Sequence, residues 1–234
     1  MSIKLIVALD FDNINAAMAL VDKLDPETTA VKIGSELFTR FGTGLVRQLV
    51  AKSYQVFLDL KYHDIPNTVA QACKAAADLG VWMMNVHASG GFAMLEAARQ
   101  ALEPYGNERP LLIAVTVLTS MSATELPSIG VQAPLLEQVC ELARLAKIAG
   151  LDGVVCSAHE AIEIKAICGD EFLAVTPGIR LADNALDDQS RIITPELALA
   201  AGSDYLVVGR PITRATHPET VIQQIQTMIR NHTL

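Results

Sequence analysis

Short apolar runs recur along the chain at nearly regular intervals. Valine and isoleucine are frequent in them, and most runs lack the polar alternation of a half-exposed strand. That pattern is typical of parallel strands that are buried on both faces. The runs cover residues 5–9, 30–33, 55–58, 81–86, 111–118, 153–156, 172–175 and 205–208.

Segments with helical spacing separate these runs. Apolar residues recur three or four positions apart in residues 16–24, 69–76 and 135–146. Proline is favoured in the first turn of a helix. Three prolines fall where first turns are expected, and they are Pro134, Pro195 and Pro218.

The alternation of strand and helix signals predicts the fold class. Eight such units predict an α/β protein, a single (β/α)8 or TIM barrel domain over residues 1–234. The alternative is an open, doubly wound sheet, in which a glycine-rich turn usually follows the first strand. Here that turn, residues 10–13, reads Asp-Phe-Asp-Asn. We therefore expect the closed barrel.

A barrel of this kind forms its active site at the C-terminal ends of its strands. In this chain, polar residues gather at those ends. They are Asp10, Lys32, Asp59 with Lys61, Asn85 with His87, Thr119 with Ser120, Ser157, Pro177 to Arg180, and Gly209 with Arg210. We therefore expect one polar site at one rim of the barrel.

Charged residues follow the third apolar run, where they are costly to desolvate unless they pair or bind a ligand. Asp59 and Lys61 are two apart on an extended segment, so both should point into the barrel mouth. Lys32 and Asp10 can complete an alternating quartet. Carboxylates favour a cationic lysine, which is a poor nucleophile but a good general acid. The alternative reading is a surface ion pair worth about 0–1 kcal/mol.

Two arginines indicate an anion site. Gly209 and Arg210 follow the eighth run, where barrels often bind phosphate. Glycine lets the backbone approach an anion, and arginine offers a bidentate fork. Arg180 follows the seventh run, so a phosphate site on adjacent loops is expected. Residues 176–195 form a long loop that can close over a ligand as a lid.

Composition narrows the choice of ligand and compartment. Of the 234 residues, 51% are hydrophobic and 19% charged, which suffices for a sizeable core. The net charge of -8 argues against nucleic-acid binding, although local cations can still hold a small anion.

The four cysteines and five histidines show no metal-ligand or disulfide spacing, and buried free thiols are expected. No apolar run approaches the ~20 residues that span a bilayer, and no signal peptide is evident. We therefore expect a soluble, cytoplasmic protein that binds neither membrane nor nucleic acid.

Residues 59–68, Asp-Leu-Lys-Tyr-His-Asp-Ile-Pro-Asn-Thr, closely resemble the signature of the orotidine 5′-phosphate decarboxylase family, bacterial type. The resemblance covers essentially the whole chain, in order. Its other motifs are residues 7–10, 31–34, 117–121, 176–180, 188–189 and 207–210. It implies conversion of orotidine 5′-monophosphate to uridine 5′-monophosphate and CO2, the last step of de novo pyrimidine synthesis, with no metal and no organic cofactor.

The resemblance also implies roles for the charged residues. Lys61 would protonate C6 as the carboxylate leaves, and Asp59 would lie against that carboxylate. Lys32 and Asp10 would anchor the ribose and the charge network. In the family, the residues that match Asp64 and Thr68 reach into the partner's site. A homodimer with shared active sites, in which Asp64 acts in catalysis, is therefore expected.

The remaining site residues implied by the resemblance contact the substrate. Ser120 would contact the pyrimidine, and Thr119 and Pro177 are further substrate-binding candidates. The phosphate would be held by Arg180, Gln189, Gly209 and Arg210. Leu181 departs from the family, which commonly continues Arg-Pro after the seventh strand, and this leaves the conformation of the lid open.

Two other functions stay open. A Mg2+-dependent sugar-phosphate decarboxylase or hexulose-phosphate synthase of the same barrel superfamily resembles this chain around residues 59–64. Those enzymes typically carry a metal-binding Glu where this chain has Lys32. The other alternative is a catalytically idle barrel that binds nucleotide phosphates as a sensor.

Overall fold

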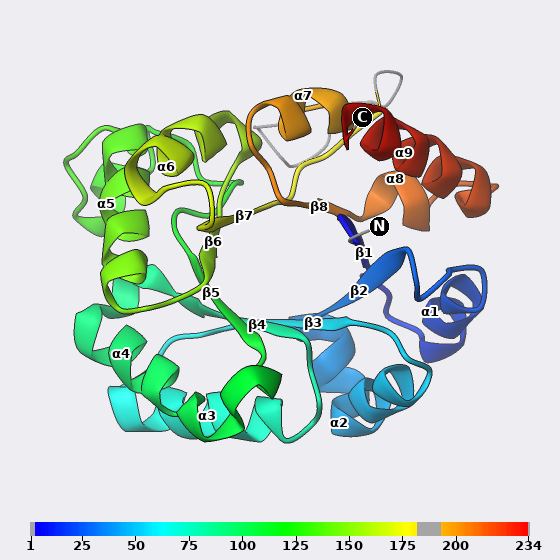
Figure 1. The fold of residues 1–234 in the computed structure, drawn as a ribbon, viewed down its shortest axis with the longest axis horizontal. Coiled ribbons are helices and arrows are strands. Elements are labelled where there is room, and N and C mark those ends of the chain that lie inside the picture. The colour runs from blue at the N-terminus through cyan, green and yellow to red at the C-terminus, as the bar shows by residue number, and fades with distance from the viewer. Residues whose placement is uncertain (1–2, 182–192, 234) are drawn as a thin grey trace.

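Eight parallel strands close into a barrel in the computed structural model, which describes residues 3–181 and 193–233 (Figure 1). The strands follow one another around the ring in chain order. They are β1 (Leu5–Ala8), β2 (Thr29–Gly34), β3 (Val56–Tyr62), β4 (Met83–His87), β5 (Leu111–Val115), β6 (Gly153–Val155), β7 (Leu173–Thr176) and β8 (Tyr205–Val208).

Helices form an outer layer around the ring of strands, as Figure 1 shows. The α-helices are α1 (Ile14–Val21), α2 (Ser35–Ala51), α3 (Pro66–Ala77), α4 (Phe92–Gln100), α5 (Leu135–Ile148), α6 (Ala161–Cys168), α7 (Pro195–Ala200), α8 (Arg210–Thr213) and α9 (Pro218–Thr233). Short 3-10 turns lie at η1 (Ala88–Gly90), η2 (Glu103–Glu108), η3 (Leu126–Ile129) and η4 (Ala158–Glu160).

The predicted (β/α)8 barrel is confirmed. β1 pairs in parallel with β2 on one side and with β8 on the other, so the sheet has no free edge. An open, doubly wound sheet, the alternative fold, is therefore excluded. Within residues 3–181 and 193–233, none of the helices is both long and apolar enough to cross a membrane.

Local sequence signals explain several helix starts. Asn13 caps α1, because its side-chain oxygen accepts hydrogen bonds from the backbone N–H groups of Asn15 (2.8 Å) and Ala16 (3.2 Å). α7 begins at Pro195 and α9 at Pro218, while Pro134 immediately precedes α5. Proline suits these positions because the first backbone N–H groups of a helix have no partner within it.

Two apolar layers hold the barrel together. The smaller layer includes Ile6, Phe57, Met83 and Ile113, all almost fully buried on alternate positions of the strands. The larger layer contains the neighbouring strand positions together with the inner faces of the helices. Burial on both faces of the sheet explains why the apolar runs show little polar alternation.

Two predicted C-terminal strand ends differ from the structure by more than one residue. β3 continues past Leu58 to Tyr62, and therefore contains Asp59 and Lys61. β5 stops at Val115, and the apolar residues that follow it line a cavity instead of extending the sheet. Hydrophobicity alone does not distinguish a buried strand from a buried loop, which is why the run at residues 111–118 overestimates β5.

Candidate active site

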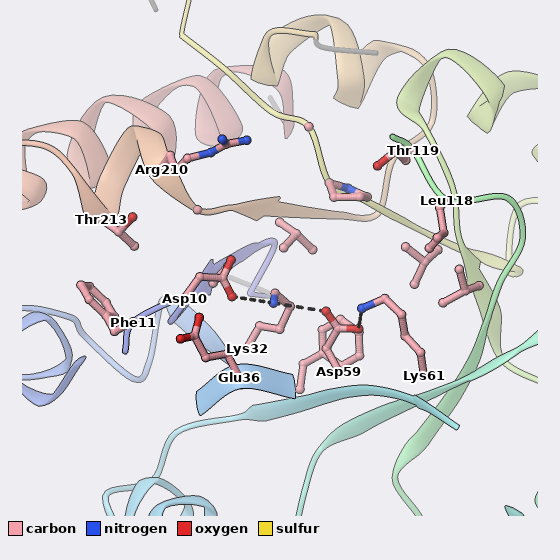
Figure 2. A pocket seen from close by; sticks show the side chains of 18 of the residues that line it. Asp10, Phe11, Lys32, Glu36, Asp59, Lys61, Leu118, Thr119, Arg210 and Thr213 are labelled. Carbon is pink, nitrogen blue, oxygen red and sulfur yellow. Dashed lines mark hydrogen bonds and ion pairs between the residues drawn. The ribbon is translucent and has the colours of Figure 1, made fainter. Parts of the chain in front are cut away.

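A cavity of about 780 Å³ opens at the C-terminal ends of the strands (Figure 2). This volume falls within the range of about 300–1,000 Å³ that is typical of small-molecule sites. Its polar lining includes Asp10, Asp12, Lys32, Glu36, Asp59, Lys61, Thr119, Arg180, Arg210, Thr213 and Arg214. The cavity therefore lies at the rim where the sequence predicts a site for a ligand.

The predicted quartet of charges forms a continuous chain inside this cavity. Lys32 Nζ lies 3.1 Å from Asp10 Oδ1 and 3.2 Å from Asp59 Oδ2. Lys61 Nζ lies 2.6 Å from the other oxygen of that carboxylate, Asp59 Oδ1. The dashed lines in Figure 2 follow this alternation of acid and base across β1, β2 and β3. The alternative of an isolated surface ion pair is therefore wrong.

Burial makes the charges of the array depend on one another. Burial tends to raise the pKa of Asp59, but the charges of Lys32 and Lys61 outweigh it, and the pKa lies below its ordinary value. Burial likewise tends to lower the pKa of Lys32, yet Asp59 and Asp10 raise it above the ordinary value. Both groups are therefore charged at neutral pH.

The backbone of β3 is irregular at the array. Lys61 has a φ of 52°, a left-handed conformation that is uncommon for a residue other than glycine. Asn85 on β4 contacts both members of the Asp59–Lys61 pair. Its Nδ2 donates to Asp59 Oδ1 at 2.7 Å, and its Oδ1 accepts from the Lys61 backbone N–H at 2.8 Å.

The predicted phosphate residues lie along the β7 and β8 ends of the cavity. Pro177, Arg180, Gly209 and Arg210 all line it. Arg180 is buried, and its backbone N–H donates to the carbonyl of Ile193 at 3.0 Å. Two arginines that face one cavity can hold a dianion such as phosphate.

Three predicted residues lie outside the cavity lining. Asp64 and Thr68 are exposed just before and within the start of α3, and Asp64 Oδ1 accepts from the backbone N–H of Ile65 at 2.6 Å. Ser120 is also exposed, while its neighbour Thr119 lines the cavity. Gln189 lies outside the described residues.

Sequence reasoning placed Asn85 at a strand end but did not assign it to the site. The available signal was an amide within the otherwise apolar start of β4, Met-Met-Asn-Val. Nearby, the rings of His63 and His87 lie 5.5 Å apart, and burial together with the charges of His63 and Lys61 lowers the pKa of His87.

The donor set at the array is not that of a divalent metal site. Within the described part of the chain, no three His, Cys, Asp or Glu side chains form a group that could hold a metal ion. The two carboxylates of Asp10 and Asp59 have the ammonium group of Lys32 between them.

The fold and the cavity together define a class, the (β/α)8-barrel enzymes that act on small phosphorylated molecules. Comparison with known proteins identifies the group within it. This chain belongs to the orotidine 5′-phosphate decarboxylase / HUMPS family, whose model matches residues 3–225.

Similar proteins cover almost the whole chain. A protein from Legionella pneumophila (strain Paris) named orotidine 5′-phosphate decarboxylase is 60% identical over 96% of this chain and 98% of its own. One of the same name from Vibrio cholerae (strain O395) is 59% identical over 97% and 98%. The crystal structure of orotidine 5′-phosphate decarboxylase from Lactobacillus acidophilus has a TM-score of 0.87 and 42% identity, covering 97% of this chain and 99% of that one.

Proposed function

We propose that this protein decarboxylates orotidine 5′-monophosphate to uridine 5′-monophosphate and CO2, the last step of de novo synthesis of that nucleotide, without a cofactor. The observation that carries the proposal is the alternating array of carboxylates and ammonium groups in a cavity that arginines also line. Relatives that are 59–60% identical bear the name of this activity.

Lys61 supplies the proton in this reaction. Cleavage of the bond between C6 and the carboxylate leaves its electron pair on C6. A proton from Lys61 Nζ then forms the new C6–H bond, and the lysine is left neutral until it is reprotonated. The 2.6 Å contact with Asp59 holds the ammonium group at one place in the cavity. A fixed cation stabilises the developing carbanion before proton transfer.

Asp59 acts on the carboxylate that leaves. Its lowered pKa keeps it ionised at neutral pH, so a substrate carboxylate held against it is repelled. That repulsion ends when the carboxyl group leaves as neutral CO2, because its negative charge passes to C6, where the proton from Lys61 neutralises it. Lys32, between Asp59 and Asp10, keeps both carboxylates in place, and the Asp10–Lys32 pair is positioned to bind ribose hydroxyl groups.

Phosphate binding provides the energy that opposes this repulsion. Arg180, Gly209 and Arg210 follow β7 and β8 in the chain, away from the Asp59–Lys61 pair on β3. Binding energy from a part of the substrate that does not react can hold the reacting part in an unfavourable contact. We therefore assign these three residues to the phosphate.

One assay tests the proposed activity. We expect the purified protein to consume orotidine 5′-monophosphate, followed by absorbance, with EDTA present throughout. Lys61→Ala should lower kcat by at least about 10²–10⁴-fold, the usual contribution of a general acid, while uridine 5′-monophosphate still binds. The matched control is Lys52→Ala, which removes an exposed lysine paired with Asp22 and should leave kcat unchanged. A near-normal kcat for Lys61→Ala would remove Lys61 from the mechanism.

The same assay separates the alternatives. A Mg2+-dependent relative would need a metal ion beside Asp10 and Asp59, but the ammonium of Lys32 lies between these carboxylates and repels a divalent cation. Loss of activity in EDTA and its return with Mg2+ would favour that relative. A nucleotide sensor would bind uridine 5′-monophosphate and release no CO2 from the substrate.

We also propose a homodimer in which each active site receives Asp64 and Thr68 from the partner. Both side chains are exposed and outside the cavity of their own chain, and the neighbouring Ile65 is 68% exposed. A large apolar side chain beside functional polar groups is a common feature of a protein interface.

The four cysteines form no disulfide, as is usual in the reducing cytoplasm where we expect this enzyme.

Subunit mixing tests the shared site. Lys61→Ala and Asp64→Ala subunits are each expected to be inactive alone. Their heterodimer has one site with both residues intact, so random exchange should restore about one quarter of the wild-type activity. Mixing Lys61→Ala with the double variant Lys61→Ala/Asp64→Ala is the control, because it contains no intact site. Mixed dimers without recovered activity would refute sharing.

A further inference from the structure

The pairing between β3, which carries Asp59 and Lys61, and β4 shifts in register. Leu58 on β3 lies opposite Met84 on β4, and Tyr62 lies opposite Val86. Over this interval β3 advances by four residues while β4 advances by two, so the regular ladder is interrupted at Asp59, Leu60 and Lys61. Irregularities such as β-bulges redirect side chains and are frequent next to active sites.

The side chain of Asn85 lies at the interruption and bonds one backbone group there, the N–H of Lys61. Asn85 has no solvent exposure, and it lies on β4 between the two paired positions Met84 and Val86. Its Oδ1 accepts from the Lys61 backbone N–H at 2.8 Å, and its Nδ2 donates to Asp59 Oδ1 at 2.7 Å. One amide therefore fixes the backbone of the lysine and the carboxylate of the aspartate together.

The backbone of Lys61 requires such support. A lysine at a φ of 52° is less stable than one in an extended conformation, by an amount of order 1–3 kcal/mol. A buried N–H without a partner would add to that cost. The bond to Asn85 Oδ1 satisfies this group, and hence it helps to hold Lys61 in the conformation that directs its ammonium group to Asp59.

Asparagine suits this position better than other side chains do. It offers a donor and an acceptor in one plane, with no charge to disturb the balance of the array. Aspartate would place a second carboxylate 2.7 Å from Asp59 Oδ1, and leucine, although similar in size, would offer neither bond. The two hydrogen bonds to β3 thus explain why a polar residue lies in the apolar strand β4.

We propose that Asn85 is a positioning residue for the decarboxylation, which locks the Asp59 carboxylate and the Lys61 backbone so that the lysine proton reaches the reacting carbon. Asn85 does not line the cavity, so it acts through its two neighbours. This inference rests on the proposed decarboxylase function, and it names a residue on which the rate of that reaction depends.

Kinetics of Asn85→Ala test the proposal. Small displacements of catalytic groups lower rates by about 10²-fold. We therefore expect kcat to fall by about that factor, whereas KM for orotidine 5′-monophosphate stays within about threefold because the phosphate contacts are untouched. The matched control is Thr116→Val. It removes another buried hydrogen bond at a strand end, from Thr116 Oγ1 to the Val155 carbonyl, without touching the array. A kcat for Asn85→Ala equal to that of Thr116→Val would overturn the proposal.

The Asn85→Asp variant adds a readout that loss of stability would not produce. When its carboxyl group and Asp59 share one proton, that proton replaces the amide N–H, and when the proton is lost the two carboxylates repel. The ratio of variant to wild-type kcat should therefore rise as the pH falls from 8 to 5. The charged groups that face this position are Asp59 and Lys61 on β3, His87 on β4 and, beyond Asp59, Lys32 on β2. They are common to both proteins, so the ratio of the two kcat values is compared and not the absolute kcat of the variant. A ratio that does not change with pH would contradict the proposed role of the hydrogen bond that Asn85 Nδ2 donates to Asp59.

Hydrogen exchange at the Lys61 amide separates this inference from the proposed function. The bond to Asn85 Oδ1 should protect this amide in the wild type, and Asn85→Ala should accelerate its exchange at least about tenfold, while Thr116→Val leaves it unchanged. An inactive wild type with this exchange pattern would refute the proposed decarboxylase activity but would support the role of Asn85 in fixing the Lys61 backbone. Equal exchange rates of the Lys61 amide in Asn85→Ala and wild type would refute that role of Asn85, whether or not the protein is active.

Discussion

Replacement of Lys32 by methionine tests whether the charged array is held together as the geometry indicates. The Lys32 side chain is 10% exposed, and its ammonium group bridges Asp10 and Asp59 at 3.1 and 3.2 Å. Methionine keeps most of the volume and removes the charge. Asp10 is 60% exposed and can turn to water, but the Asp59 side chain is only 12% exposed and would lose one of its two cations.

The expected loss of stability follows from that burial. Removal of one partner from a buried ion pair typically costs about 3–5 kcal/mol, because the other charge stays buried. Asp59 keeps its contacts with Lys61 and Asn85, so we expect the lower end, about 3 kcal/mol. For a domain of this size, that loss corresponds to a decrease in Tm of roughly 6–12 °C.

Equilibrium urea unfolding at a fixed protein concentration measures this loss, because subunit association also contributes to stability. Lys52→Met is the matched control. Its ammonium group lies at the same distance, 3.1 Å, from Asp22, but the two side chains are 44% and 63% exposed. An exposed pair contributes about 0–1 kcal/mol. Equal losses for the two variants would refute the reasoning from burial.

The pH dependence assigns the loss to Asp59. In the wild type, burial tends to raise the pKa of Asp59, but Lys32 and Lys61 lower it below 3.8. The stabilisation from this carboxylate is therefore complete above pH 3.8, and it is lost as the pH falls through the lower pKa of the folded state. Without Lys32 the pKa rises, and protonation relieves the buried charge at a higher pH. The difference between wild type and Lys32→Met should shrink as the pH falls from 7 towards 4. A difference independent of pH would point to a cause other than Asp59.

Three further predictions concern separate parts of the molecule. Arg210→Ala should raise KM for orotidine 5′-monophosphate about 10–100-fold through loss of a charge-assisted bond to phosphate, and an unchanged KM would exclude Arg210 from that site. Tyr54→Phe should lower the free energy of unfolding in urea by about 1 kcal/mol, with kcat unchanged, because the buried hydroxyl donates to the carbonyls of Val21 (2.8 Å) and Leu24 (2.9 Å). Burial raises the pKa of Cys73 to about 12, so iodoacetamide at pH 8 should label it, by peptide mass mapping, only after unfolding.

The sequence predicts the barrel well because its strands are buried on both faces. The run at residues 205–208 has the same bounds as β8, since apolar residues there end abruptly at glycine and arginine. The ends of β3 and β5 were harder to predict. β3 includes two charged residues, because they pair with each other, and the two apolar residues after β5 line the cavity instead of extending the strand.

The candidate site divides in the same way. Asp10, Lys32, Asp59 and Lys61 could be expected to meet, because strand order in a barrel brings the C-terminal ends of successive strands together. The contacts of Asn85 could not be expected from the sequence, since they arise where the pairing of β3 with β4 shifts in register. A regular period of two places side chains on one face or the other, and it contains no information on where a strand gains extra residues.

The balance of charge in the cavity explains how a protein with a net charge of -8 can bind an anion. Within the array, the ammonium groups of Lys32 and Lys61 offset the carboxylates of Asp10 and Asp59, so the array adds little net field. In the proposed mechanism, attraction for the substrate comes from the arginines, and Figure 2 shows Arg210 and Lys61 on opposite sides of the cavity. In that mechanism the substrate is held by its phosphate at one side of the cavity. At the other side, its carboxylate meets Asp59, which repels it, and Lys61, whose charge stabilises the carbanion that forms when CO2 leaves. Separation of binding from chemistry across one cavity lets tight binding promote the reaction instead of opposing it.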